Sequence, residues 1–336
     1  MNLLEVRDLA VDFKVPRQGS LLPARLRAVS NVDLDIRRGE ILGVVGESGC
    51  GKSTTGRAIL QLLRPSHGSV TFDGTELTTL PKRRMRAMRR RMQMVFQDPF
   101  ASLNPRMTIG ELIEEPLLVH SDLDASGRRR KAYETMQLVG LSEQWHDRYP
   151  HEFSGGQRQR VGIARALVSG PDFVVADEPV SALDVSVQAQ IVNLLEQLQE
   201  ELGLTMMFIA HDLAVVRHLC DRIAVMYLGT VVEVGGSEEI YLRPQHPYTK
   251  ALLSAVPIPD PLVETDRQRI ILTGDVPSPL DPPSGCRFRT RCWKAQDVCA
   301  TTAPPLSNAT LSTTDTGHRV ACHFPENAPI AVGEKN

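Results

Sequence analysis

Hydrophobic positions over the first three quarters of the chain follow two alternating spacings. Short apolar runs rich in β-branched residues occupy 41–45, 173–176 and 205–210, and stretches with apolar residues at helical intervals lie between them. Alternation of strand-like and helix-like spacing is typical of an α/β fold. The pattern therefore predicts one α/β domain over 1–256.

The amino-acid composition of the sequence changes after Val256. Eleven of the 23 prolines lie beyond this residue, and proline cannot donate to the hydrogen-bond ladder of a helix or sheet. We therefore expect a small, loop-rich second module over 257–336. A chain of 336 residues is long enough for one large domain with such an appendage.

Composition and charge exclude several classes of protein. A formal net charge of −2 argues against a protein that mainly coats nucleic acid or anionic membrane. No stretch approaches the roughly 18 consecutive apolar residues of a membrane-spanning helix, and the N-terminus lacks the apolar core of a signal peptide. We expect a cytoplasmic chain whose six cysteines are not disulfides, because the cytosol keeps thiols reduced.

One run of positive charge contains no intervening acid. Such a run is compatible with phosphate or RNA contact, but the near-neutral total charge favours a solvated helix face ahead of a strand at 92–96. The basic residues of this run are Lys82, Arg83, Arg84, Arg86, Arg89, Arg90 and Arg91.

A strand, a glycine-rich loop and a helix follow one another from residue 41. The strand 41–45 leads into a match to G-x-x-x-x-G-K-[ST], and helical spacing continues through Leu63. Glycines let backbone N–H groups point at phosphate oxygens, and the helix N-terminus adds its positive dipole end. We predict that Lys52 bridges the β and γ phosphates of ATP and that Ser53 binds Mg²⁺. The predicted nucleotide loop is Gly46, Glu47, Ser48, Gly49, Cys50, Gly51, Lys52, Ser53 and Thr54, in which the Cys50 side chain is no ligand.

The apolar strand 173–176 ends in two carboxylates, Asp177 and Glu178. A carboxylate at a strand tip beside a P-loop holds Mg²⁺, which suits Asp177, and the next one reaches an attacking water, which suits Glu178 as general base. Alone, this pattern is weak evidence. After a P-loop it indicates a nucleoside triphosphatase.

A second helix start looks suited to phosphate. Ser154 is a predicted N-cap, two glycines allow close backbone approach, and Val161, Ala164 and Leu167 face inward. One chain can use this helix start and the P-loop on one nucleotide only if two subunits face each other head to tail. The predicted phosphate-binding residues here are Ser154, Gly155, Gly156 and Gln157.

The segment 153–160 resembles the signature motif of the ABC ATPases, whose dimers sandwich ATP between the P-loop of one subunit and the signature of the other. Phe153 stands where leucine is commoner. The resemblance implies a RecA-like core with a helical signature subdomain. It also implies a Q-loop with Gln97 contacting Mg²⁺ or the attacking water, a D-loop with Asp184, and a switch histidine, His211, contacting the γ-phosphate.

Related ATPases stack the adenine on an aromatic residue ahead of the P-loop. Phe13 is the candidate here, because base stacking on an aromatic ring is worth roughly 1–3 kcal/mol. A core phenylalanine at the end of the first strand is the alternative.

Four of the six cysteines fall in the second module, with the spacing C-x5-C-x6-C and a longer return: Cys286, Cys292, Cys299 and Cys322. Four cysteines that converge in a region with little core are better explained as metal ligands. Cys220, in an apolar stretch, is instead expected to be a buried hydrophobic residue. Zinc favours shorter spacings, so we predict a 4Fe–4S cluster, with zinc as the alternative. The arginines between these cysteines either offset thiolate charge or form a surface face: Arg287, Arg289 and Arg291.

The motifs around this cluster, at 246–249, 277–279 and 282–286, resemble the C-terminal region of dipeptide and oligopeptide importer ATPases, and the similarity covers nearly the whole chain. The F-type subunit is the most similar. This implies a bacterial protein, peripheral at the cytoplasmic face of the membrane, which pairs with a related D-type ATPase under two membrane subunits and is served indirectly by an extracytoplasmic peptide-binding protein.

Three other functions are compatible with parts of this pattern. Nickel importers share the layout. A soluble ABC ATPase acting on ribosomes or nucleic acid is disfavoured by the single ATPase domain and the C-terminal position of the cysteines, so we expect no nucleic-acid partner. A silent regulatory ATPase is disfavoured by intact Lys52, Glu178 and His211.

Overall fold

The computed structural model describes residues 1–16, 23–256, 269–308 and 317–326. The chain divides into two compact units: the first is 1–4, 36–41 and 71–210, and the second is 5–35, 42–70 and 211–336. The expected boundary at residue 257 lies outside the described residues. The division into 1–256 and 257–336 therefore stays a prediction.

The first unit contains three parallel strands, β6 (Met92–Val95), β7 (Phe173–Asp177) and β8 (Thr205–Ile209). β7 lies between the other two, with Phe173 opposite Met92 on one side and Thr205 on the other. Every residue of β7 and β8 is buried, which explains their continuous apolar runs. The predicted strands are therefore confirmed.

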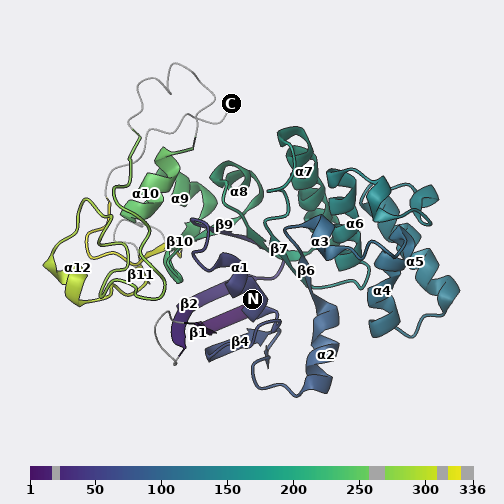
Figure 1. Ribbon diagram of the computed structural model, residues 1–336, viewed down its shortest axis with the longest axis horizontal. Coiled ribbons are helices and arrows are strands. Elements are labelled where there is room, and N and C mark those ends of the chain that lie inside the picture. Colours follow the sequence, from purple (N-terminus) through teal and green to yellow (C-terminus); the bar gives the residue numbers. More distant parts are fainter. Residues whose placement is uncertain (17–22, 257–268, 309–316, 327–336) are drawn as a thin grey trace. The chain divides into compact units, whose positions relative to one another are not determined.

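The helices of the first unit include a group of three, α4 to α6, which Figure 1 shows together. α4 begins at a capping box, in which Thr108 and Glu111 satisfy each other's backbone N–H groups. The predicted inward residues of α6, Val161, Ala164 and Leu167, are all buried. The helices are α2 (Lys82–Arg91), α3 (Pro99–Ser102), α4 (Ile109–His120), α5 (Ala125–Leu138), α6 (Gly155–Leu167) and α7 (Val185–Leu202).

The arginine run forms α2, where only Met85 is buried. Its basic side chains are exposed, as predicted, except at Arg91. Arg91 pairs with Asp73 at 2.6 Å and with Asp172, and its guanidinium lies 5.0 Å from the centre of the Phe72 ring. The predicted solvated face therefore stops at Arg91, the last residue of the helix, which is half-buried among these partners.

In one sheet of the second unit, five strands are neighbours in the order β11, β12, β10, β9 and β3. β3 and β9 are parallel, with Leu42 opposite Arg222, and the other pairs are antiparallel. β2, β1 and β4 are neighbours in a further sheet. The bounds are β1 (Asn2–Val15), β2 (Ala24–Arg37), β3 (Ile41–Val45), β4 (His67–Phe72), β9 (Arg222–Tyr227), β10 (Thr230–Gly236), β11 (Ser307–Asn308) and β12 (Arg319–Val320).

The helices of the second unit are short. α1 ends at Ile59 rather than continuing through Leu63 as predicted, because Gln61 adopts a left-handed φ of 55° that a helix cannot continue. The helices are α1 (Lys52–Ile59), α8 (Leu213–Leu219), α9 (Ser237–Leu242), α10 (Pro247–Ser254) and α12 (Asp297–Thr301). Within the described ranges, no helix combines the length and the apolar composition needed to cross a membrane.

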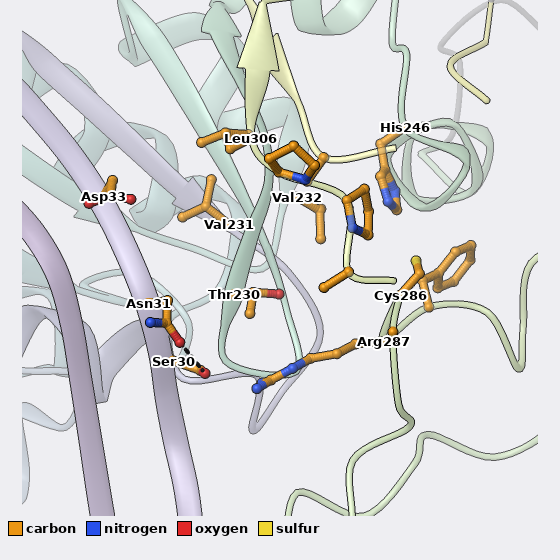
Figure 2. Close-up of a pocket in the computed structure, with 16 residues that line it drawn as sticks. Ser30, Asn31, Asp33, Thr230, Val231, Val232, His246, Cys286, Arg287 and Leu306 are labelled. Atoms are coloured by element: carbon orange, nitrogen blue, oxygen red, sulfur yellow. Dashed lines mark hydrogen bonds between the residues drawn. The ribbon is translucent and has the colours of Figure 1, made fainter. Parts of the chain in front are cut away.

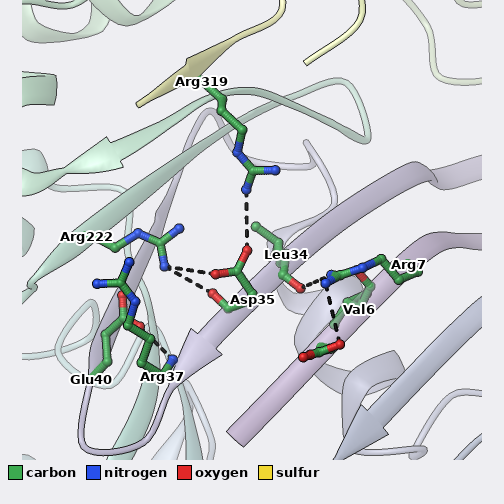
Figure 3. Close-up of polar contacts among 9 residues, drawn as sticks. Val6, Arg7, Leu34, Asp35, Arg37, Glu40, Arg222 and Arg319 are labelled. Carbon is green, nitrogen blue, oxygen red and sulfur yellow. Dashed lines mark hydrogen bonds and ion pairs between the residues drawn. The ribbon is translucent and has the colours of Figure 1, made fainter. Parts of the chain in front are cut away.

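Polar side chains hold the C-terminal segment to the rest of the second unit. Figure 3 shows Asp35 of β2 receiving Arg222 of β9 at 3.5 Å and Arg319 of β12 at 3.4 Å. The buried Glu233 of β10 pairs with His318 at 2.8 Å. A buried carboxylate is tolerated only when it is paired or hydrogen-bonded, so these contacts fix where β12 joins β10.

Candidate functional site

The glycine-rich loop after β3 needs its glycines at both ends. Gly46 and Gly51 have φ values of 151° and 103°, which residues with a side chain rarely adopt. A Cβ atom would lie 2.1 Å from the Met226 carbonyl oxygen at Gly46, and 2.5 Å from the Ala28 carbonyl oxygen at Gly51. The backbone of the loop therefore leaves no room for a side chain at either of these positions.

Lys52 is the first residue of α1, and its side chain is buried against the loop. Its Nζ donates to the carbonyl oxygens of Gly46, at 2.8 Å, and Glu47, at 3.2 Å. A buried ammonium in the first turn of a helix is suited to an anion with several oxygens.

Neighbouring segments brace the same loop. The Gly229 N–H donates to the Cys50 carbonyl oxygen at 2.8 Å, and the Glu47 N–H donates to the Tyr248 hydroxyl oxygen at 2.9 Å. Tyr248 was not predicted at this site. The histidine-proline-tyrosine sequence at 246–248 is the local signal that could have found it. It starts α10, because buried His246 caps this helix by accepting from the Tyr248 N–H.

The end of β7 presents the two carboxylates. Asp177 is fully buried, and Glu178 adopts a left-handed φ of 45°. The Glu178 N–H donates to the Ile209 carbonyl oxygen at 2.9 Å, and the Glu178 Oε2 accepts from the Gln97 Nε2 at 2.8 Å. Strained backbone at a polar strand end is typical of functional sites. Gln97 and Glu178, 81 positions apart, are thus brought into direct contact.

The start of α6 has the predicted cap. The Ser154 hydroxyl accepts from the Gln157 N–H at 3.3 Å, and the Gln157 side-chain oxygen accepts from the Ser154 N–H at 2.9 Å. A Cβ on Gly156 would lie 2.5 Å from Val187 of α7. Asp184 caps α7 by accepting from the Val187 N–H, and hydrogen bonds from Ser186 and this N–H lower the pKa of Asp184.

The remaining predicted residues fall in the second unit. His211 is exposed and directly precedes Asp212, which caps α8. Phe13 lies on β1 and is 36% exposed, more than a core phenylalanine would be. The glycine-rich loop shares this unit, whereas Gln97, Asp177, Glu178, Ser154 and Asp184 belong to the first.

The four C-terminal cysteines line one small cavity of about 10 Å³, which is room for about one water molecule. They are free thiols. Burial raises the pKa values of Cys286 and Cys292, and raises the pKa of Cys322 to about 11. Among the residues that the structure describes, no three His, Cys, Asp or Glu side chains are grouped so as to hold a metal ion. The predicted cluster therefore gains no support from this arrangement.

The interleaved arginines differ in their contacts, and Arg289 lines the cavity of the four cysteines, so its role in offsetting thiolate charge stays a prediction. Arg287 donates to the Leu228 carbonyl oxygen, and Arg289 donates to the Ser284 carbonyl oxygen. Figure 2 shows Arg287 at a cavity of about 500 Å³, pointing away from Cys286 and towards Ser30. The prediction for Cys220 is confirmed, because this residue is buried and its sulfur leaves no room for a side chain at Gly43.

Two family models match the chain. The model described as "ABC transporter" matches residues 29–181, which include the glycine-rich loop, the capped start of α6 and the acidic end of β7. The model described as "Oligopeptide/dipeptide transporter, C-terminal region" matches residues 232–299.

Curated relatives match along nearly the whole chain. A putative peptide import ATP-binding protein of Brucella ovis is 56% identical over 320 residues, which are 95% of this chain and 97% of that protein. The putative oligopeptide transport ATP-binding protein YkfD of Bacillus subtilis is 53% identical over 98% of this chain and 97% of its own. The oligopeptide transport ATP-binding protein OppF of Haemophilus influenzae is 53% identical over 95% of this chain and 96% of its own.

Solved structures show the same fold. The ATP-binding cassette MJ0796, in a dimeric post-hydrolysis state with ADP and Pi, has a TM-score of 0.63 and 32% identity, over 70% of this chain and 98% of its own. CbiO1 of Clostridium perfringens has a TM-score of 0.61 and 28% identity, over 71% of this chain and 90% of its own. The chain therefore belongs to the ATP-binding proteins of the ABC transporter family, in the group that carries the oligopeptide/dipeptide transporter C-terminal region.

Proposed function

We propose that the chain is the ATP-hydrolysing subunit that powers import of dipeptides and oligopeptides through an ABC transporter. The observation that carries this proposal is that one chain combines the cassette match over 29–181 with the peptide-transporter match over 232–299. The names of the full-length relatives, which are peptide import and oligopeptide transport ATP-binding proteins, support the same substrate class.

In this proposal the glycine-rich loop holds the triphosphate of ATP. Its backbone N–H groups contact phosphate oxygens, and Lys52 turns from the loop carbonyls to the β and γ phosphates. Ser53, Gln97 and Asp177 would hold Mg²⁺, and the ion would neutralise developing charge on the phosphates. The closed backbone at Gly46 and Gly51 supports this role, because it leaves no space for side chains.

Glu178 acts as the general base in the proposed reaction. It takes the proton of the attacking water, and Gln97 orients the carboxylate through the hydrogen bond at 2.8 Å. His211 contacts the γ-phosphate, and Phe13 stacks on the adenine. Phosphoryl transfer needs positioned groups more than covalent chemistry from the protein, which is why the fixed position of Glu178 matters.

The helix start at Ser154 is proposed to serve a second subunit. Ser154, Gly155, Gly156 and Gln157 offer backbone donors to the nucleotide on a partner ATPase, with Asp184 beside them. The dimeric state of the related cassette MJ0796 supports this arrangement. We propose a heterodimer with a related ATPase, docked under two membrane subunits at the cytoplasmic face and served by an extracytoplasmic peptide-binding protein.

Transport in a reconstituted system tests the substrate class. Liposomes with the two membrane subunits, both ATPases and the binding protein are expected to accumulate labelled dipeptides or oligopeptides only when Mg²⁺ and ATP are present on the ATPase side. The matched control carries the chain with Lys52→Ala, which removes the phosphate-binding ammonium. ATP-dependent uptake of Ni²⁺ with no uptake of peptide would refute the peptide assignment.

We further propose that Cys286, Cys292, Cys299 and Cys322 bind a 4Fe–4S cluster, a proposal that is supported by the spacing of these cysteines in the sequence. Anaerobically purified chain is then expected to contain iron and acid-labile sulfide and to absorb broadly in the visible range. Cys292→Ser should lower the iron content, and the control Cys220→Ser should not. Stoichiometric zinc without iron or sulfide would contradict the cluster.

A further inference from the structure

The segment between the first two C-terminal cysteines, 286–292, contacts the glycine-rich loop directly. Arg291 Nη1 lies 3.0 and 2.9 Å from the two carboxylate oxygens of Glu47, the second residue of that loop. The two residues are 244 positions apart in the sequence. Their side chains are 8% and 26% exposed, so solvent screens this ion pair less than one on an open surface.

The same segment also contacts the turn between β9 and β10, which in turn is hydrogen-bonded to Cys50 of the glycine-rich loop. Arg287 donates to the carbonyl oxygen of Leu228, in the turn between β9 and β10. The next residue, Gly229, donates its N–H to the Cys50 carbonyl oxygen. Gly229 has a left-handed φ of 82°, and a Cβ there would lie 2.8 Å from the Ala28 carbonyl oxygen, so glycine is required in this turn.

An aromatic cluster keeps this segment in place. Phe288 is 1% exposed, and its ring centre lies 5.2 Å from that of Tyr227 and 5.5 Å from that of Tyr248. Tyr248 is also the residue whose hydroxyl accepts from the Glu47 N–H. Packed rings have few alternative arrangements, so a movement of 286–292 would be transmitted to Glu47.

The charge on Glu47 makes the ion pair matter for nucleotide binding. A carboxylate in a loop that receives a triphosphate repels it, and the repulsion is strong where solvent is partly excluded. Arg291 neutralises that carboxylate and fixes its direction. Among the described residues, Lys52 also contacts Glu47, but it donates to the carbonyl oxygen of Glu47 and not to its carboxylate.

We propose that Arg291 is a positioning residue of the nucleotide site, which neutralises and orients Glu47 so that the glycine-rich loop accepts the triphosphate. The C-terminal cysteine segment is then part of the ATP-binding apparatus. This inference rests on the proposed ATPase function. Arg291 touches no reacting atom, so its loss should raise KM and leave kcat near the parental value.

The test is a set of equilibrium ATP affinities measured on the full chain. Arg291→Met is expected to raise the Kd for ATP about tenfold, since it leaves a carboxylate unpaired in the site. Glu47→Gln alone is expected to lower the Kd about threefold, because the Arg291 charge is then available to the phosphates. The double variant should return to within about threefold of the parent.

Arg289→Met is the matched control. Arg289 lies in the same segment but is bonded only locally, to Ser284, so this variant should keep the parental Kd. An unchanged Kd in Arg291→Met would overturn the proposal. So would a double variant as weak as Arg291→Met, because that result would mean that the arginine merely holds the segment folded. A parental chain that binds no ATP would instead overturn the proposed function.

Discussion

Glu178→Gln is expected to bind ATP with parental affinity and to hydrolyse it at least about a hundredfold more slowly, since general base catalysis is worth roughly 10² to 10⁴ in rate. The amide has the size of the carboxylate, and its oxygen can still accept from Gln97 Nε2, which donates to Glu178 at 2.8 Å. It cannot take a proton from water at neutral pH. The measurements are ATP affinity and phosphate release by the complete ATPase pair.

The control for this variant is Glu200→Gln, which changes the same chemistry at an exposed position of α7. It should hydrolyse ATP at the parental rate. If Glu178→Gln in the assembled complex released phosphate as fast as the parent, Glu178 would not be the base. If it lost ATP affinity as well, its role would be in binding.

Gly51→Ala is expected to lower the affinity for ATP by at least about a hundredfold. The new Cβ would lie 2.5 Å from the Ala28 carbonyl oxygen, and the residue holds a φ of 103° that alanine rarely adopts. A backbone oxygen of β2 cannot turn away as a flexible side chain can. The loop must therefore leave its present shape, and the proposed contacts with the phosphates are lost.

Gly49→Ala is the matched control in the same loop. Gly49 also has a left-handed φ, of 77°, but a Cβ there would meet no atom within 4 Å. Only backbone strain of about 1 kcal/mol remains, which corresponds to a loss of affinity of about fivefold. Equal affinities for the two variants would mean that contact with Ala28 does not shape the loop. Urea unfolding of both variants separates loss of binding from loss of fold.

These predictions depend on residues whose local sequence was informative. The strand 41–45, the loop after it and the acidic end of β7 appear in the structure as the sequence indicated. Ser154 caps α6 as its position before two glycines suggested. Caps, left-handed glycines and buried strands are set within a few residues, so a local pattern is sufficient to find them.

Charged side chains were less predictable, because their partners are distant in the chain. Arg91 looks like its exposed neighbours in the sequence, yet it pairs with Asp172, 81 positions away. Arg291 looks like a counter-ion for thiolates or a surface group, yet it pairs with Glu47. The end of α1 was missed for a different reason: apolar Leu62 suggested more helix, but the left-handed φ of Gln61 ends the helix before it, and Leu62 is 47% exposed.

The sequence alone determined the α/β class, the nucleotide loop, the candidate base and the family resemblance, since each rests on short motifs in which neighbouring residues specify one another. Only the tertiary structure decided that Gln97 is hydrogen-bonded to Glu178, and that Tyr248 and the turn at Gly229 are hydrogen-bonded to the loop. It also decided that Arg291 of the cysteine segment forms an ion pair with Glu47. Such contacts join residues from separate elements. They exist only after burial has excluded water and packing has fixed which side chains meet.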